Sequence, residues 1–394
     1  MKPSHYLERA QAIEADLIRW RRDFHQHPEL AFHEFRSAGI ISAHLEPLGF
    51  QVETGVAETG VVAVLKGGRS SRSLVLRFDM DALPVEEVAD HSYASVVPGV
   101  MHACGHDGHM AIGMGVARLL AEGSNELPGT VALVFQPAEE GQGGAERMLE
   151  TGFLERLKPD TALALHLWND LPVGSMGVTA GPVMAGADRF VCTVHGRGGH
   201  AAMPHMSTNP VPAAAALVQV LQAIPSQESD PREPFVLTVT RLHGGKAFNV
   251  IPDSVELEGT LRYFSHELRQ QVITRMHEAV EATAGAFGCR GELDVQAVAV
   301  PVVNDPEVTG RIQSFIDQQL PSCQCRTDFL LMVSEDMAYF LARVPGCYLF
   351  VGSGNEERGL TAAHHNPSFD FDERALVNGT GWLAAITQRL LEVE

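Results

Sequence analysis

The stretch MHACGHDGHMAIGMGVARLLAE, residues 101–122, joins a cluster of potential metal ligands to an amphipathic segment. Its first nine residues contain three histidines, a cysteine and an aspartate, where average composition would give roughly 0.4 histidine. His102, Cys104 and His106 alternate, so an extended segment would point all three side chains to one side. Asp107 is expected to cap the helix that follows. A ligand-rich strand end leading into a helix is typical of the binding edge of an open α/β sheet, although a buried cysteine among structural histidines is the alternative.

The residues on both sides of this stretch alternate between short apolar strands and helices. Such alternation predicts a largely parallel sheet that is covered by helices on both faces. The same alternation of strands and helices resumes after residue 300. The predicted strands are 61–66, 73–78, 130–136, 161–167 and 346–351, and the predicted helices are 37–48, 108–122, 144–151, 305–319 and 373–391.

Residues 184–299 follow a different order, strand–helix–strand–strand–helix–strand, which is that of the ferredoxin-like unit. The predicted fold class is therefore α/β: a larger domain (1–183 and 300–394) with a mostly parallel mixed sheet, interrupted by an inserted ferredoxin-like α+β domain (184–299). The edge strands of the insert could pair with a second copy, so we expect a homodimer through it. The elements of the insert are expected at 189–195, 210–223, 235–243, 254–264, 266–287 and 292–298.

The length of 394 residues predicts two domains, and the net charge is −20. This charge disfavours a nucleic-acid partner and provides no basic patch for a membrane. No apolar run approaches the ~20 residues that span a bilayer. Six scattered cysteines form no disulfide framework, so we expect reduced thiols and a cytoplasmic location. The N-terminal segment has no signal-peptide core but the stripe of an amphipathic helix, formed by Tyr6, Ala10, Ile13, Leu17, Trp20 and Phe24.

Three further segments contain side chains that could join the cluster. Glu139 and Glu140 follow the third predicted strand, and adjacent carboxylates can divide metal binding and proton transfer between them. A pair of surface glutamates is the alternative. His166 lies near the end of the fourth predicted strand, where a single histidine is more often structural. His364 and His365 precede the last helix, which suggests one ligand with a second histidine behind it.

Two other segments could assist such a site. Asp79 and Asp81 close an apolar strand, where a carboxylate could accept the second N–H of a ligating imidazole. A strand-terminating turn is the alternative. In the insert, the glycine-rich segment GRGGHAAMPH (196–205) contains His200 and His205. This loop could bring a proton donor to a substrate, or it could be a bulge and a turn.

Seven segments occur in a fixed order: LRFDMDALPVEE (76–87), MHACGHDGHM (101–110), FQPAEEGQGGA (135–145), GRGGHAAMPH (196–205), FNVIPDSVELEGTLR (248–262), EDMAYFL (335–341) and HHNPSFDFDERAL (364–376). This set resembles the metal-dependent N-acyl-amino-acid amidohydrolases, which include hippurate hydrolase and plant auxin-conjugate hydrolases and are related to aminoacylase and glutamate carboxypeptidase. The match spans nearly the whole chain. Phe78 replaces a small residue, and residues 206–209 replace a run that usually ends in Asp, but neither departure removes a candidate ligand.

The resemblance implies a hydrolase with two divalent metal ions, a catalytic domain and an inserted dimerisation or lid domain. It implies that Glu139 is the general base and that Asp81 steadies the site. His200 would reach the active site of the partner subunit and stabilise the oxyanion, while Asn249 and Arg262 would hold the carboxylate or carbonyl of the substrate. The implied metal ligands are Cys104, His106, Glu140, His166 and His365, the last chosen over its neighbour because it directly precedes the Asn-Pro pair.

The implied reaction is hydrolysis of the amide bond of N-acyl-L-amino acids, including hippurate-like substrates. A dipeptidase or carboxypeptidase of the same family is the nearest alternative. Two other classes stay open: a thiol amidase with Cys104 as the nucleophile, and a non-catalytic metal-binding protein, which would leave Glu139 and Glu140 without a purpose. The ligand set is compatible with Zn, Mn, Ni or Co.

Overall fold

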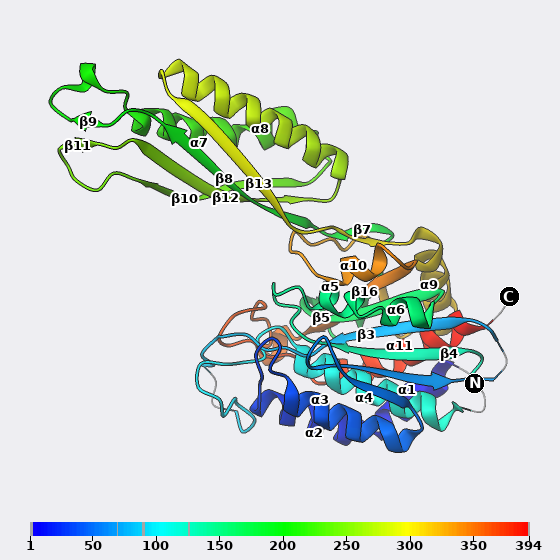
Figure 1. The fold of residues 1–394 in the computed structure, drawn as a ribbon. Coiled ribbons are helices and arrows are strands. Elements are labelled where there is room, and N and C mark those ends of the chain that lie inside the picture. Colours follow the sequence, from blue (N-terminus) through cyan, green and yellow to red (C-terminus); the bar gives the residue numbers. More distant parts are fainter. Residues whose placement is uncertain (1–2, 69, 89–90, 125–126, 393–394) are drawn as a thin grey trace. The chain divides into compact units, whose positions relative to one another are not determined.

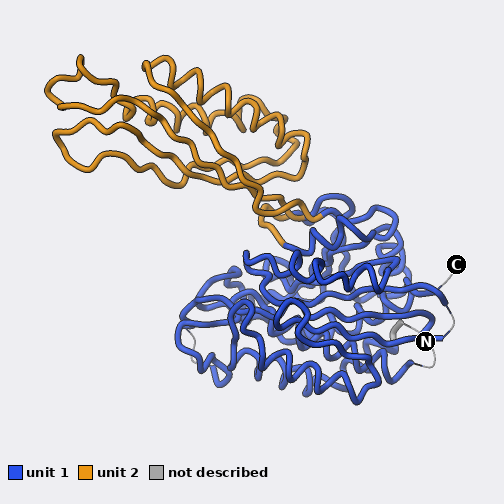
Figure 2. Tube along the Cα trace, viewed as in Figure 1, with its two compact units in different colours: residues 1–183, 303–330, 336–394 blue, residues 184–302, 331–335 orange. Residues whose placement is uncertain are grey.

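The computed structural model describes residues 3–68, 70–88, 91–124 and 127–392. Contacts divide the chain into two compact units (Figure 2). The first comprises Met1–Val183, Val303–Leu330 and Asp336–Glu394, and the second comprises Met184–Val302 with Leu331–Glu335. The second unit thus includes a short segment from beyond residue 300, which the sequence pattern assigned to the larger domain.

The first unit is built on an eight-stranded mixed sheet. From one edge to the other, its strands are β1 (Gln51–Val56), β2 (Gly60–Lys66), β4 (Thr130–Gln136), β3 (Ser73–Asp79), β5 (Thr161–Pro172), β16 (Gly346–Gly354), β6 (Ser175–Gly177) and β15 (Gln324–Arg326). The centre is parallel, because β3 pairs in parallel with β4 and β5, and β5 with β16. Antiparallel pairs of β2 with β1 and β4, and of β6 with β16, complete the predicted mixed sheet.

Helices cover both faces of this sheet, with α4 and α11 on one face and α5 and α10 on the other (Figure 1). The N-terminal stripe is buried except for the half-buried Trp20. It belongs to two helices rather than one, because the helix is interrupted at Ile13. The helices are α1 (Pro3–Ala12), α2 (Glu14–Gln26), α3 (Phe35–Leu45), α4 (His106–Glu122), α5 (Gly144–Glu150), α6 (Phe153–Leu157), α9 (Pro306–Gln319), α10 (Met337–Leu341) and α11 (Arg374–Leu391), with short 3₁₀ turns at Glu46–Leu48 and Glu356–Arg358.

The close packing of α4 on the sheet depends on two glycines. A Cβ atom at Gly108 would lie 2.5 Å from Cδ1 of Leu167 on β5. A Cβ atom at Gly113 would lie 2.7 Å from the ring of Phe135 on β4. Glycine therefore lets the helix backbone approach both strands. This packing fixes the first residues of α4 next to β5.

The second unit has a four-stranded antiparallel sheet and two helices (Figure 1). In chain order its elements are β8 (Gly186–His195), α7 (Pro210–Glu228), β10 (Phe235–Gly244), β12 (Ser254–Tyr263), α8 (His266–Ala286) and β13 (Arg290–Ala299). The spatial order β10-β12-β8-β13 is that of the predicted ferredoxin-like unit. A small two-stranded sheet in this unit joins β9 (Gly199–His200) to β11 (Val250–Ile251), and a 3₁₀ turn spans Pro204–Met206. The pair of β7 (Gly181–Met184) with β14 (Val302–Asn304) belongs mostly to the first unit.

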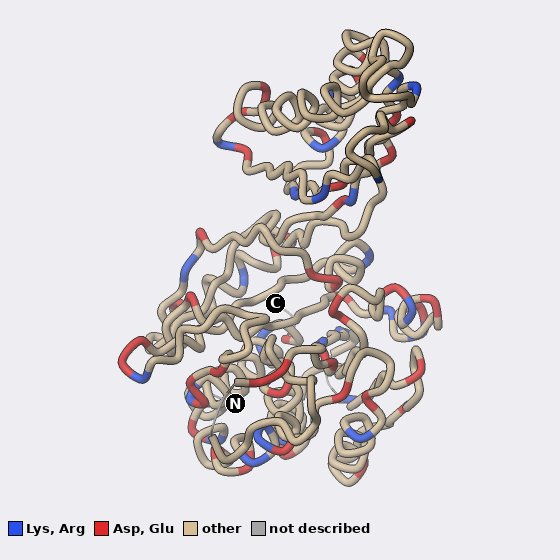
Figure 3. Tube along the Cα trace, turned by 90° about the vertical axis from the view of Figure 1, so that its left-hand side faces the viewer, with Lys and Arg blue, Asp and Glu red and all other residues tan. Residues whose placement is uncertain are grey.

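Acidic residues outnumber basic residues in the chain. The chain has 49 Asp and Glu residues against 29 Lys and Arg residues. Figure 3 shows the basic positions dispersed among the acidic ones along the trace of each unit. Among the described residues, no helix combines the length and the apolar character needed to cross a membrane.

Candidate active site

The candidate active site lies at the carboxyl ends of two neighbouring strands, β3 and β4, and beside the middle of the longer strand β5. Asp81 follows β3, Glu139 and Glu140 follow β4, and His166 lies on β5. Because β4, β3 and β5 are parallel neighbours, their carboxyl ends meet at the same edge of the sheet. Helix α4 begins beside them with His106. The topology thus gathers side chains that are distant in sequence.

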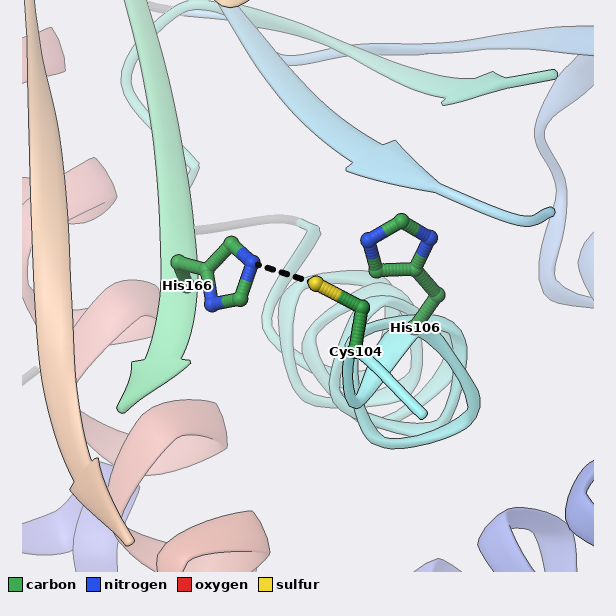
Figure 4. Close-up of side chains that lie close together, drawn as sticks. All are labelled: Cys104, His106 and His166. Carbon is green, nitrogen blue, oxygen red and sulfur yellow. Dashed lines mark hydrogen bonds between the residues drawn. The ribbon is translucent and has the colours of Figure 1, made fainter. Parts of the chain in front are cut away.

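Cys104, His106 and His166 lie close together (Figure 4). Sγ of Cys104 is 3.5 Å from Nε2 of His166. Nδ1 of His106 lies 2.9 Å from the Asp81 carbonyl oxygen, and Nδ1 of His166 lies 2.7 Å from the Leu167 carbonyl oxygen. A carbonyl can only accept, so each Nδ1 donates, and Nε2 is the ring nitrogen of each histidine that is left to bind a metal.

Glu140 and His365 complete the cluster. Nε2 of His365 lies 3.1 Å from Oε1 of Glu140. The ligand atoms of Cys104, Glu140 and His365 lie within 4.8 Å of one another, as do those of His106, Glu139 and Glu140. The fold therefore brings all the ligands implied by the resemblance into one cluster, with Glu139 beside them.

The two neighbouring histidines before α11 have different surroundings. Nε2 of His364 lies 2.9 Å from the Leu167 carbonyl oxygen, to which it donates. The ring of His364 also stacks on Trp168, with centroids 4.1 Å apart. His364 is therefore engaged with the backbone of β5, while His365 faces Glu140.

The donor set fits divalent cations. Within the described part of the chain, the buried atoms Nε2 of His106 and Oδ1 of Asp81 make no hydrogen bond. Leaving such atoms unpaired is costly, and a cation in the cluster would accept the lone pair of His106. Thiolate, imidazole and carboxylate are ligands of Zn, Mn, Ni and Co. Cys104 and Glu140 each belong to two overlapping groups of ligand atoms, so the cluster can be shared by two cations.

The protonation states of the cluster depend on such a cation. Burial raises the pKa of Cys104 well above its usual value, and nearby carboxylates, Glu140 foremost, raise it further. Burial alone would lower the pKa of His106, but the nearby aspartates, Asp79 foremost, raise it to about 10. Without a cation, both groups are protonated at neutral pH. A protonated thiol is a weak nucleophile, which disfavours the thiol amidase.

A buried ionic network supports the cluster. Oδ1 of Asp79 lies 2.5 Å from Nδ1 of His109, and Nη1 of Arg77 donates to Oδ2 of Asp79 over 2.6 Å. Nε2 of His109 accepts the Leu167 N–H over 2.9 Å, so both ring nitrogens of His109 are engaged. Arg77 also donates to Asp336 over 2.8 Å. Arg77 and Asp336 were not among the residues predicted from the sequence, although an arginine in an otherwise apolar strand was an available signal.

Two expectations for the stretch 101–109 are wrong. Asp107 does not cap α4, because the cap position is Gly105 with φ 84°, a left-handed conformation that favours glycine. The Asp107 carboxylate instead lies 2.8 Å from both Nε of Arg21 and Nδ1 of His25. The residues before α4 form a turn rather than an extended segment. Among the described residues the buried His102 ring has no hydrogen-bond partner, and burial lowers its pKa to about 3.

Comparison with known proteins agrees with this geometry. Residues 75–389 match the Peptidase family M20/M25/M40. The chain belongs to this family. It is 37% identical over 380 residues to the N-acetyl-L-cysteine deacetylase of Bacillus subtilis, covering 96% of this chain and 89% of that protein. It is 36% identical over 386 residues to thermostable carboxypeptidase 2 of Saccharolobus solfataricus, covering 97% of this chain and 96% of that protein.

A solved structure supports the same assignment. A dinuclear metal-binding peptidase of the M20 family from Bacillus subtilis has a TM-score of 0.86 and 34% identity, covering 97% of this chain and 99% of that chain. The predicted resemblance is thus confirmed, and the chain is a metal-dependent amidohydrolase of the M20 family with a centre suited to two divalent metal ions.

The second unit of this M20 enzyme contains the other predicted site residues. His200 on β9 is exposed and pairs with Val250 on β11, which places it beside the exposed Asn249. The Asn249 carbonyl accepts the Ala201 N–H over 3.1 Å. Arg262 lies on a different sheet, on β12, where it donates to the Leu261 carbonyl over 3.0 Å. Within this unit, His200 and Asn249 are therefore neighbours, while Arg262 belongs to a separate sheet.

Proposed function

We propose that this M20 enzyme hydrolyses the amide bond of N-acyl-L-amino acids, releasing a carboxylic acid and a free amino acid. One observation carries the proposal: Glu139 and Glu140 are adjacent and both belong to the cluster with His106. One carboxylate can therefore bind metal while its neighbour moves a proton. Cys104, His106, Glu140, His166 and His365 would hold two divalent cations, and these, when bound, polarise the scissile carbonyl and make the attacking water more acidic.

Glu139 is the general base in this proposal. Its carboxylate takes a proton from the attacking water and passes that proton to the nitrogen of the leaving amine. Glu140 is less suited to this task, because its side chain faces His365. The backbone N–H of Glu140 donates to Oδ2 of Asp81 over 3.0 Å. Asp81 thereby steadies the backbone of a ligand.

The proposal also assigns roles to the second unit. His200 donates a hydrogen bond to the oxyanion in the active site of the partner subunit of a homodimer, an effect typically of about 3–4 kcal/mol. Asn249 and Arg262 hold the carboxylate or carbonyl of the substrate. The exposure of His200 supports a role toward another subunit or a ligand. We place the enzyme in the cytoplasm.

Small acylated amino acids are the proposed substrates, with hippurate-like compounds among them. The Bacillus subtilis relative, which is named as a deacetylase of N-acetyl-L-cysteine, supports this class. A carboxypeptidase or dipeptidase is the second candidate, and the Saccharolobus solfataricus relative, which is named as a carboxypeptidase, favours it. Zn²⁺, Mn²⁺, Ni²⁺ and Co²⁺ are the candidate metals.

A substrate panel tests the proposal. The metal-free enzyme is reconstituted separately with each of the four metals, and kcat/KM is measured for N-acetyl, N-benzoyl and indole-acyl amino acids and for free dipeptides. We expect at least one acyl amino acid to be cleaved with a higher kcat/KM than any dipeptide. Faster cleavage of the dipeptides under all conditions would favour the peptidase instead.

A further inference from the structure

A second group of metal-binding side chains lies outside the proposed active site. His25 lies on α2, while Glu87 and His91 lie in the segment after β3. Their ligand atoms all lie within 4.8 Å of one another. Nε2 of His25 and Nε2 of His91 are each 3.1 Å from Oε1 of Glu87. The proposed mechanism uses none of these three residues.

We infer that His25, Glu87 and His91 bind a further divalent transition metal, with zinc as the metal to test and water as the fourth ligand. Two imidazoles and one carboxylate are a ligand set of open four-coordinate zinc sites. Tetrahedral zinc with bonds of ~2.0–2.2 Å places its ligand atoms roughly 3.3–3.6 Å apart. The two separations of 3.1 Å therefore need only a small expansion, and the two imidazole nitrogens, which lie within 4.8 Å of each other, could close around the ion.

His25 is already oriented as a ligand. Its ring is fully buried, and Nδ1 lies 2.8 Å from Oδ2 of Asp107. Asp107 is held in turn by Nε of Arg21 over 2.8 Å. A carboxylate on Nδ1 fixes the tautomer of a metal-binding histidine, and here it directs Nε2 toward Glu87. The ring is therefore positioned before any metal arrives.

His91 lacks a competing partner. Within the described residues, neither of its ring nitrogens makes a hydrogen bond, even though Nε2 lies close to Glu87. Burial lowers the pKa of His91, which keeps the imidazole neutral, as metal binding requires. The ring stacks on Tyr93 with centroids 3.9 Å apart. A neutral, oriented and unpaired imidazole thus faces the carboxylate that already contacts His25.

The surrounding charges favour an additional cation. Arg21 contacts three carboxylates, and Arg22 contacts one of the same three. Glu87, which contacts His25, adds a fourth carboxylate, so this region contains four carboxylates and two guanidinium groups. Burial alone would lower the pKa of His25, but Asp107 and Glu87 raise it overall, which indicates that this position favours positive charge. Zinc would take the place of the proton on Nε2 of His25. The carboxylates are Glu87, Asp107, Asp370 and Glu373.

Metal analysis tests the inference. Chelator-stripped wild-type, His91→Gln and Glu87→Gln proteins are reloaded with excess zinc, desalted and analysed by mass spectrometry of the metal. We expect each variant to retain one zinc equivalent per chain fewer than the wild type. His5→Gln, at an exposed histidine on α1, is the matched control and should lose none. Equal zinc in the wild type and both variants would overturn the inference.

Anomalous diffraction at the zinc edge provides a second measurement that needs no variant. Crystals of the wild-type protein should show a peak between His25, Glu87 and His91, separate from the cluster around Cys104. Peaks confined to that cluster would overturn the inference. Both tests locate or count metal rather than measure turnover, so a negative result leaves the proposed amide hydrolysis unaffected.

Discussion

At the scale of single residues, Glu139 and Glu140 are expected to respond differently to the same change. Glu139→Gln keeps the shape of the side chain but removes the proton acceptor, so kcat should fall by a factor of ~10²–10⁴ while metal content is unchanged. Glu140→Gln, the matched control, should lower metal content as well. Initial rates and metal analysis on the same samples check this. Near-normal turnover of Glu139→Gln would refute its role as the base.

Cys104 and His106 should make zinc binding depend on pH. Both groups are protonated in the metal-free protein, because the pKa of Cys104 is raised by burial and that of His106 is about 10. Zinc that binds this cluster must displace both protons, so we expect the cluster to release about two protons and its apparent affinity to rise with pH. Calorimetry in buffers of different ionisation enthalpy measures both quantities. An affinity independent of pH would contradict these protonation states.

Glu34 is a buried carboxylate that was not predicted from the sequence. Its Oε1 accepts the Ala138 N–H over 3.0 Å, and its Oε2 accepts the Thr59 hydroxyl over 2.5 Å. Ala138 has a φ of 55°, an unfavourable conformation for a residue with a side chain. Glu34 therefore holds the loop that carries Glu139. Burial raises the pKa of Glu34 to about 7.

The raised pKa of Glu34 makes the free energy of unfolding depend on pH. The folded protein holds the proton on Glu34 more tightly than the unfolded chain, so the resulting stabilisation is present below about pH 4.5 and is lost as pH rises through about 7. Glu34→Gln mimics the protonated form. The free energy of unfolding of this variant, relative to that of the wild type, should therefore be higher at about pH 8 than at about pH 5. Urea unfolding at both pH values measures the difference. A constant difference would contradict the prediction.

At the scale of elements, α4 offers a matched pair of glycine substitutions. Gly113→Ala places a methyl group 2.7 Å from Phe135 and should destabilise the first unit by ~1–3 kcal/mol. Gly39→Ala on α3 meets no atom within 4 Å and should stabilise it by ~0.5–1 kcal/mol. Tryptophan fluorescence during urea unfolding reports on the first unit, because all three tryptophans lie there. Equal effects of the two substitutions would contradict the close packing of α4.

Most elements could be predicted from the sequence because their signals are local. The strand 130–136 matches β4, and the helix predicted over 305–319 is α9 with Asp305 as its cap. The break at Ile13 could not be predicted, because the apolar stripe continues unchanged through it. The role of Asp107 was missed for another reason: its partners, Arg21 and His25, come from a distant helix. Spacing along a chain reveals ligand types, but not ion pairs between elements.

At the scale of the whole molecule, the proposed role of His200 in the partner subunit can be tested by complementation. His200→Ala and Glu139→Gln are each expected to be nearly inactive alone. In a mixed dimer, one site would combine an intact Glu139 with the partner's intact His200. After subunit exchange at equal amounts, about a quarter of wild-type activity should return. No recovery, with exchange verified by labelled subunits, would place His200 in its own subunit's site or outside the mechanism.

The peptide backbone of Leu167 links three parts of the chain at the metal cluster. Its carbonyl accepts from His166 and His364, and its N–H donates to His109. Because every amino acid except proline supplies both groups, exchanging the leucine side chain tests only packing. An amide-to-ester replacement at this bond would remove the donor to His109 and leave every side chain intact. Some of the hydrogen bonds that orient these imidazoles thus come from the backbone, and a comparison of residue types would not reveal them.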